Sequence, residues 1–223
     1  MAGRRTWGAV RRLPSGRYQA QWLNPDTHQL TPAPQTFPTK TDADRWLDAK
    51  TIVRLLAYGG LRIGEALALR RSNLDRVGHT LTIRESAGEV HGRLVVGPTK
   101  TYAVRTITLP TSLSAELALR LAHRPGDPDT VIFANKHGNH RRYRIWMRDS
   151  WAKAIQETKV AATPHDLRST CASLLIDAGA SVEDVQQHLG HSSVITTMTI
   201  YAKIRPGRSA DLASKLDHLI AES

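Results

Sequence analysis

The sequence predicts an α+β fold, mostly helical with a small antiparallel sheet, preceded by a three-stranded β module plus a helix. Two observations support this prediction. The segment 17–22 alternates polar with apolar or aromatic residues, which is typical of a half-buried strand, and further strand candidates such as 104–109 follow later in the chain. From residue 51 onward the pattern becomes mainly helical: the apolar density of 52–58 indicates a buried helix, and 61–69 places apolar residues at helical spacing. The 223 residues allow one ordinary domain with a small appendage, or two small domains.

Residues 1–50 are expected to form the β module. Its candidate strands are 7–10, 17–22 and 35–37, with turn residues between them. Thr41 and Asp44 have the spacing of a capping box, so they are expected to open a helix that continues through Trp46 and Leu47 and covers the sheet. A module of this size is marginal for folding alone.

Residues 51–223 are expected to form the second, larger domain. Its candidate strands are 80–83, 94–96 and 104–109, where Pro110 ends the last one. Thr163 is an N-cap candidate followed by Pro164 and by an acid at the third helical position, which predicts a firm helix start. A further helix is expected to open at Ser181 and to end at Gly190.

The charge of the chain predicts a polyanionic partner. Lysine and arginine number 31 against 20 acidic residues, which gives a net charge of +11 and a pI near 10.3. Nucleic acid is favoured over a membrane because no apolar run approaches the roughly 18 residues of a membrane span. The start of the chain lacks the apolar stretch of a signal peptide, so we expect a cytoplasmic protein.

The first 23 residues carry five arginines and no acid, which predicts a basic, DNA-binding sheet face; a merely solvated face is the alternative. These arginines are Arg4, Arg5, Arg11, Arg12 and Arg17. The single cysteine, Cys171, cannot form an intrachain disulfide and is expected to be a small buried residue. No metal site is expected, because no third ligand stands at characteristic spacing from the candidate histidines.

Five short motifs follow one another between residues 60 and 201. Taken singly, each has an ordinary explanation as a surface arginine, a solvated lysine, a loop histidine or a tyrosine at the edge of a core. Their joint occurrence in this order makes coincidence improbable. The motifs are Gly60-Leu61-Arg62-Ile63-Gly64-Glu65, Pro98-Thr99-Lys100, His165-Asp166-Leu167-Arg168, Leu189-Gly190-His191 and Tyr201.

These motifs resemble the catalytic boxes of tyrosine recombinases of the phage integrase type. The chemistry of that family explains the residue types. A phosphodiester under attack gains negative charge on its equatorial oxygens, and fixed cations are needed to stabilise it. Arg62 and Arg168 suit this task because a guanidinium stays charged and presents forked donors to two oxygens.

The resemblance assigns a role to each remaining residue. It implies that Tyr201 is the nucleophile that forms a 3′-phosphotyrosine, and that Lys100 protonates the departing 5′ oxygen. It implies that His165 assists proton transfer at the tyrosine and that His191 donates a hydrogen bond to the phosphate. Glu65 is expected to orient Arg62, although its spacing also permits an ordinary helical ion pair. No cofactor, metal or small-molecule substrate is implied, and the implied partner is double-stranded DNA.

The main departure of the sequence from the family pattern concerns its domains. Integrases usually carry an arm-binding domain, a core-binding domain and a catalytic domain, and we expect the core-binding domain to be missing here, with an N-terminally shortened catalytic domain after an arm-type module. The main hypothesis is site-specific recombination or integration of DNA. The alternatives are a non-catalytic remnant that binds DNA and regulates or competes with an intact integrase, and topoisomerase-like nicking.

Two expectations concern assembly. Family members form tetramers on paired sites, which implies a homo-tetramer on DNA, while a shortened chain that stays monomeric is the alternative. The apolar positions in the helical segment 211–220 are expected either to pack on their own domain or to dock on a neighbouring protomer.

Overall fold

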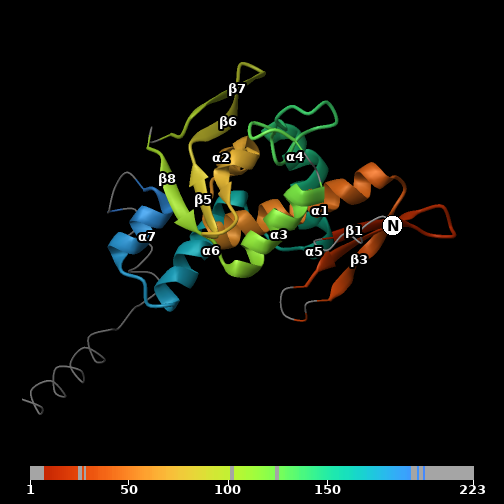
Figure 1. Ribbon diagram of the computed structural model, residues 1–223, viewed down its shortest axis with the longest axis horizontal. Coiled ribbons are helices and arrows are strands. Elements are labelled where there is room, and N and C mark those ends of the chain that lie inside the picture. The colour runs from red at the N-terminus through yellow and green to blue at the C-terminus, as the bar shows by residue number, and fades with distance from the viewer. Residues whose placement is uncertain are drawn as a thin grey trace, which may run out of the picture.

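The computed structural model describes residues 8–24, 27, 29–100, 103–123, 126–191, 195 and 198. The described residues form small antiparallel sheets and a larger helical part, and helix α1 runs between the N-terminal sheet and the rest of the molecule (Figure 1). In this part of the chain no helix is both long and apolar enough to cross a membrane. The elements are β1 (Gly8–Arg12), β2 (Tyr18–Leu23), β3 (Leu30–Phe37), α1 (Lys40–Gly59), α2 (Ile63–Ala68), η1 (Arg71–Asn73), β4 (Leu74–Asp75), β5 (Thr80–Ile83), β6 (Glu85–Val90), β7 (Arg93–Pro98), β8 (Arg105–Thr108), α3 (Thr111–His123), α4 (Tyr143–Trp146), η2 (Met147–Trp151), α5 (Ala152–Thr158), α6 (Pro164–Asp177) and α7 (Val182–Leu189).

The N-terminal sheet has the strand order β1-β2-β3, and both strand pairs are antiparallel. This confirms the predicted three-stranded sheet. Its inner face contributes Ala20, Ala33 and Phe37 to a small core, which Ala43 and Leu47 of α1 complete. The helix therefore covers the sheet, as expected, because its apolar positions are spaced by four residues and lie on one face.

Helix α1 begins earlier than the sequence predicted. Its N-cap is Thr39, whose hydroxyl accepts a hydrogen bond from the backbone nitrogen of Asp42 at 3.1 Å, whereas Thr41 lies inside the helix. The predicted cap at Thr41 is therefore wrong. Thr39 and Asp42 have the same capping spacing as Thr41 and Asp44, and the earlier start adds helical hydrogen bonds before the first core position, Ala43.

Helix α1 takes part in two cores. Ala43 and Leu47 pack under the N-terminal sheet, while Ile52, Leu55 and Leu56 lie in the main core. Residue 50, where the sequence analysis divided the chain, thus lies inside one continuous helix, between the residues that serve the two cores.

The strands of the larger part form two separate sheets. β5 pairs with β4 and β8, whereas β6 and β7 form a two-stranded hairpin of their own. The predicted strand at 94–96 therefore belongs to a different sheet from those at 80–83 and 104–109. The sequence analysis missed β6, because Glu85, Gly88 and Glu89 give it no strand-like alternation.

Capping residues in the sequence correctly predicted where α6 and α7 begin and where α7 ends. Thr163 caps α6 and forms a capping box with Asp166, and Ser181 does the same for α7 with Asp184. Gly190 ends α7 in the left-handed conformation, with φ of 66°. Both helix starts and this helix end agree with the prediction.

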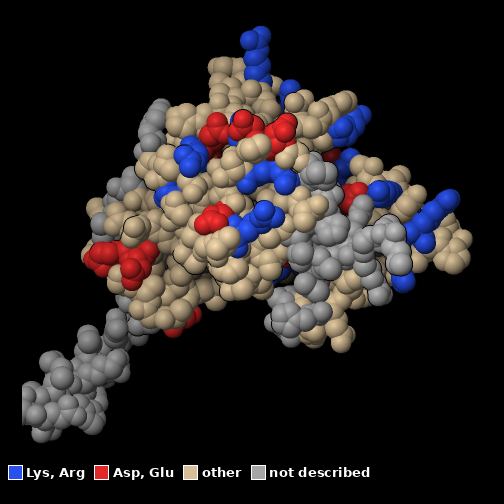
Figure 2. Space-filling view, viewed as in Figure 1, with Lys and Arg blue, Asp and Glu red and all other residues tan. Residues whose placement is uncertain are grey.

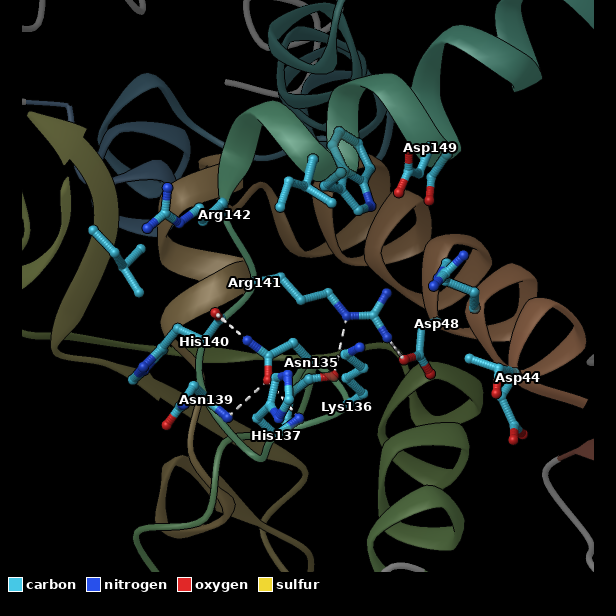
Figure 3. A pocket seen from close by; sticks show the side chains of 17 residues that line it. Asp44, Asp48, Asn135, Lys136, His137, Asn139, His140, Arg141, Arg142 and Asp149 are labelled. Atoms are coloured by element: carbon cyan, nitrogen blue, oxygen red, sulfur yellow. Dashed lines mark hydrogen bonds and ion pairs between the residues drawn. The ribbon is translucent and has the colours of Figure 1, made fainter. Parts of the chain in front are cut away.

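A buried carboxylate ties α1 to the larger part. Asp48 is fully buried and pairs with Arg120 of α3 and with Arg141, which precedes α4. Figure 3 shows Arg141 extending to Asp48 from the loop that carries Asn135 and His140. Arg141 also donates a hydrogen bond from Nε to the carbonyl of Ala134 at 3.1 Å. Because a buried charge without partners is costly, these contacts hold α1 against α3 and the loop.

Candidate functional site

On the face of the molecule that Figure 2 shows, charge alone does not mark a functional surface. On the face shown in Figure 2, basic side chains are spread from the tip of the β6–β7 hairpin to the N-terminal sheet, and acidic side chains gather below the hairpin and at the edge formed by α7. The site therefore has to be located from the geometry of the predicted residues.

Four segments far apart in the sequence meet around a set of arginines. The turn after α1 carries Arg62, the strand β8 carries Arg105, the helix α6 carries Arg168, and the turn after α7 carries His191. Hydrogen bonds between these segments, described below, bring them together. Three of these four residues, Arg62, Arg168 and His191, were predicted as site residues.

Gly60 makes the approach of the first and last segments possible. It ends α1 with φ of 64°, a left-handed conformation that side chains disfavour. A Cβ atom at this position would lie 2.4 Å from Cδ2 of Leu189 and 3.1 Å from Sγ of Cys171. Glycine therefore lets the chain turn toward Arg62 while it packs directly on α7. Cys171 itself is buried, as predicted.

Arg168 is buried, with only 2% of its surface exposed, and it connects the other segments. Its guanidinium donates hydrogen bonds to the carbonyls of Gly60 and Leu189. Burial, followed by the charge of Arg62, lowers its pKa to about 9, so the group is still charged at neutral pH. Among the described residues its Nε has no hydrogen-bond partner, which leaves a buried donor available.

Glu65 is fully buried and binds two arginines. Its Oε1 accepts a hydrogen bond from Nη1 of Arg62 at 2.9 Å, and its Oε2 accepts one from the backbone nitrogen of Arg62 at 2.9 Å. The two terminal nitrogens of Arg105 bind the same carboxylate at 3.0 and 2.7 Å. Burial raises the pKa of Glu65, but the hydrogen bond and charge of Arg105 and those of Arg62 outweigh it, so the pKa lies below its ordinary value.

Arg62 is the most accessible of the three arginines in the cluster. About 25% of its side chain is exposed, and its Nη2 donates a hydrogen bond to the carbonyl of Gly190 at 3.3 Å. Glu65 therefore forms an ion pair with Arg62, which both of its expected roles require. The carboxylate also caps α2 through the backbone nitrogen of Arg62, a role that was not expected.

His191 lies in the field of these cations. Burial, followed by the charges of Arg168, Arg62, His165 and Arg105, lowers its pKa to about 4. The imidazole is therefore neutral at pH 7, and a neutral imidazole still has one N–H to donate. His165 is exposed in the first turn of α6, one turn before Arg168, where free backbone amides favour an anion.

Lys100 is not brought into the cluster by any described contact. It follows the end of β7 in an exposed turn, and within the described ranges no hydrogen bond or ion pair joins it to the arginines. Tyr201 lies outside the described residues, as do Arg4, Arg5 and the segment 211–220. The position of the predicted nucleophile relative to the cluster thus stays a prediction.

Three of the N-terminal arginines are described, and all are exposed. Nε and Nη2 of Arg11 bind Oε1 of Gln19 at 2.9 and 2.6 Å, and Nε of Arg17 binds Oγ1 of Thr36 at 2.7 Å. Side chains alternate along a strand, so Arg12 lies on the same face as Val10, which packs against the small core. The outer face therefore carries Arg11 and Arg17 but not Arg12.

The sequence analysis missed Arg105, although a signal was present. In β8 the side chains of Arg105 and Ile107 point the same way, and Ile107 is buried in the main core. An arginine in phase with the apolar residues of a strand requires a buried anionic partner, which here is Glu65. The sequence alone does not say which acid that partner is.

One pocket lies apart from this cluster. It has a volume of about 710 Å³ and lies between α1, the loop 134–142 and the helical segment of α4 and η2 (Figure 3). None of the described candidate site residues lines it. Within the described part of the chain, no group of three or more histidine, cysteine, aspartate or glutamate side chains is arranged to hold a metal ion.

The chain is similar in sequence to known integrases. A model of the phage integrase family matches residues 29–208. The ICEBs1 integrase of Bacillus subtilis strain 168 is 27% identical over 232 aligned positions, which cover 95% of this chain and 58% of the relative. The integrase of Mycobacterium phage D29 is 27% identical over 76% of this chain and 47% of its own length. The chain thus spans less than two thirds of either relative.

Solved structures share the fold. The integrase of transposon Tn1549, solved in complex with transposon right end DNA, superimposes with a TM-score of 0.64 and 19% identity, over 81% of this chain and 60% of that one. The XerA recombinase superimposes with a TM-score of 0.57 and 23% identity, over 79% of this chain and 63% of that one. Because the family model matches most of the sequence, the chain belongs to the phage integrase family.

Proposed function

We propose that the protein recombines or integrates DNA at specific sites, by cutting and rejoining a strand through a 3′-phosphotyrosine intermediate. The observation that carries this proposal is the convergence of Arg62, Arg168 and His191 from three separate segments, held together by the hydrogen bonds of Arg168 and Glu65. Guanidinium groups present forked donors, so two of them beside an imidazole can bind the oxygens of a single phosphate.

The cluster suits the charge that develops in the reaction. Two guanidinium groups are fixed before the substrate arrives, so little reorganisation is needed when negative charge grows on the equatorial oxygens. Arg168 is buried, which strengthens its interaction with an anion because water screens it poorly. Neutral His191 adds an N–H donor, and His165 at the start of α6 lies on the side where backbone amides also favour the phosphate.

The remaining steps are assigned by family membership. The hydroxyl of Tyr201 attacks the phosphorus, His165 assists removal of its proton, and the bond from phosphorus to the 5′ oxygen breaks. Lys100 supplies a proton to that oxygen, which leaves as a 5′ hydroxyl. A 5′ hydroxyl of the partner strand then attacks the phosphorus of the phosphotyrosine and gives up its proton. The bond to the tyrosine oxygen breaks, and Tyr201 takes up a proton and is released, so each step conserves one phosphodiester bond without a metal or a nucleotide cofactor.

We also propose a division of labour along the chain. Residues 1–50 would contact arm-type double-stranded DNA through the outer face of the N-terminal sheet, and residues 51–223 would perform catalysis. Arg11 and Arg17 on that outer face support the first role, since exposed guanidinium groups neutralise backbone phosphates. Assembly as a tetramer on paired sites belongs to the same proposal.

The catalytic proposal is tested by trapping the covalent intermediate. The probe is a pool of nicked suicide duplexes with a randomised core, from which covalently attached DNA is recovered after a denaturing gel. We expect an adduct with the wild-type protein and with Tyr143→Phe, which alters an exposed tyrosine on α4, but none with Tyr201→Phe. DNA binding without any adduct would support the non-catalytic alternative, and a persistent adduct in Tyr201→Phe would show that another residue is the nucleophile.

The arm-binding proposal has its own test. Arg11→Ala and Arg17→Ala should each weaken binding to an arm-type duplex and reduce the slope of log K against log salt by about one counterion. The control is Arg76→Ala, which removes an exposed arginine from the turn after β4. If affinity and slope are unchanged in Arg11→Ala and Arg17→Ala, the outer face of the sheet is merely solvated and does not bind DNA.

A further inference from the structure

We infer that Arg105 is a positioning residue for the strand-cleavage site, an inference that rests on the proposed function. All three of its guanidinium nitrogens are engaged within the protein. Nη1 and Nη2 bind the carboxylate of Glu65 at 3.0 and 2.7 Å, and Nε binds the carbonyl of His188 at 3.2 Å. Its side chain is only 8% exposed, so it acts through its neighbours and not on the phosphate itself.

Arg105 connects the two segments that carry the candidate catalytic residues Arg62 and His191. It stands in β8, the strand that follows the turn of Lys100. Through Glu65 it reaches the carboxylate that holds Arg62, and through the carbonyl of His188 it reaches the turn that ends at His191. A shift of Arg105 would therefore move Arg62 and His191 relative to each other.

The sequence makes room for this contact. A Cβ atom on Gly190 would lie 2.9 Å from Cδ of Arg105 and 3.1 Å from its Nη1. Glycine at this position thus serves two purposes: it ends α7 in the left-handed conformation, and it leaves a path along which Arg105 reaches Glu65. A side chain there would displace the arginine from the carboxylate.

Arg105 also determines how Arg62 is held. Glu65 is fully buried, and with Arg105 present its charge is shared between two cations. Without Arg105 the carboxylate would have Arg62 as its remaining cation among these contacts, which would draw that guanidinium inward. Loss of Arg105 would also remove the main interaction that opposes the effect of burial on Glu65, so the carboxylate would take up a proton at higher pH.

The test uses Arg105→Gln, with Arg105→Lys as a milder variant that keeps the charge. The matched control is Arg70→Gln, because Arg70 also binds a carboxylate and a backbone carbonyl, those of Glu85 and Asp129, at 2.9 and 3.0 Å. Near-UV circular dichroism checks that each variant is folded. The rate of adduct formation with the suicide duplex and its dependence on pH are measured for each protein.

We expect adduct formation to fall by about 100-fold in Arg105→Gln, as for a small misplacement of catalytic groups, and by less in Arg105→Lys, while DNA affinity stays within about twofold. The rate of Arg105→Gln should also decline toward acidic pH, where the wild-type rate shows no such decline from Glu65. A rate and pH profile in Arg105→Gln equal to those of Arg70→Gln would overturn the inference.

A second readout separates this inference from the proposed function. Inorganic phosphate is titrated while the Nε–H resonance of Arg62 is followed by NMR. We expect phosphate to shift this resonance in the wild-type protein and not in Arg105→Gln. If the wild-type protein forms no adduct, the proposed function fails, and the phosphate response alone decides the role of Arg105: an equal response in both proteins would refute it.

Discussion

The guanidinium of Arg168 donates a hydrogen bond to the carbonyl of Gly60, which stands 108 residues earlier in the chain. This bond joins α6 to the turn that carries Arg62, and a second bond to the carbonyl of Leu189 joins α6 to the turn that carries His191. One buried cation therefore organises the segments on which the proposed phosphate site depends. The stability of these turns and the function of the site should respond together to mutation.

Gly60→Ala tests how far the stability of these turns depends on their close packing. The substitution places a side chain at φ of 64° and a Cβ atom 2.4 Å from Leu189, which is fully buried and has little room to move. We expect the free energy of unfolding to fall by about 2 to 3 kcal/mol in urea titrations. Gly16→Ala is the control, because Gly16 has φ of 79° but nothing within 4 Å of its Cβ position. It should lose only about 1 kcal/mol, and equal losses in both variants would show that the contact with Leu189 has no effect.

The start of α1 provides a second prediction. Thr39 caps the helix and Thr41 lies within it, although the sequence favoured Thr41. Thr39→Ala should therefore lower the free energy of unfolding by about 1 kcal/mol, the usual cost of losing an N-cap side chain. Thr41→Ala should change it by less than about 0.5 kcal/mol. Thermal unfolding of both variants measures the difference, and the reverse order would place the helix start at Thr41.

Sequence patterns predicted those parts of the fold whose causes are local. Thr163 and Asp166 cap α6 through neighbouring atoms, and Gly190 ends α7 through its own backbone freedom. β6 was missed because its six residue pairs with β7, and not its own composition, make it a strand.

In the candidate site, too, sequence patterns did not predict the features that depend on tertiary contacts. The order of the motifs predicted Arg62, Arg168 and His191, which the fold brings together. Arg105 was missed because its role depends on its ion pair with Glu65, which lies 40 residues away in the chain. A strand pattern shows that Arg105 points toward the core, but only the tertiary structure identifies the acid that it meets.

The pKa of His191 predicts how stability depends on pH. The unfolded imidazole takes up a proton near its ordinary pKa of 6.5, whereas the folded one, half-buried among cations, resists protonation until about pH 4. Between these values the unfolded chain binds more protons, so the free energy of unfolding falls as the pH drops from 6.5 to 4. Because the ring is partly solvated, we expect its share of this loss to be only about 1 kcal/mol.

His191→Gln should remove that share. Urea titrations at several pH values should give a shallower decline on the acid side for this variant than for the wild-type protein. His137→Gln, which alters an exposed histidine in the loop before α4, is the control and should follow the wild-type curve. If the stability of His191→Gln declined as steeply as that of the wild type, the arginines would not lower the pKa of this imidazole as described.

The ion pairs of Asp48 should matter more to stability than any exposed pair. Asp48 is fully buried between Arg120 and Arg141, and Arg120 is itself 1% exposed. Asp48→Asn would leave these guanidinium groups without their shared charge, so we expect a loss of about 3 to 5 kcal/mol in the free energy of unfolding. Arg141→Met should lower the free energy of unfolding by less, because Arg120 would still pair with the carboxylate of Asp48. The control is Asp149→Asn, whose ion pair with the exposed Arg148 is screened by water and should contribute little to stability. A small effect of Asp48→Asn would mean that the contact between α1 and α3 is held by apolar packing, and that the N-terminal sheet keeps its place without the buried charge.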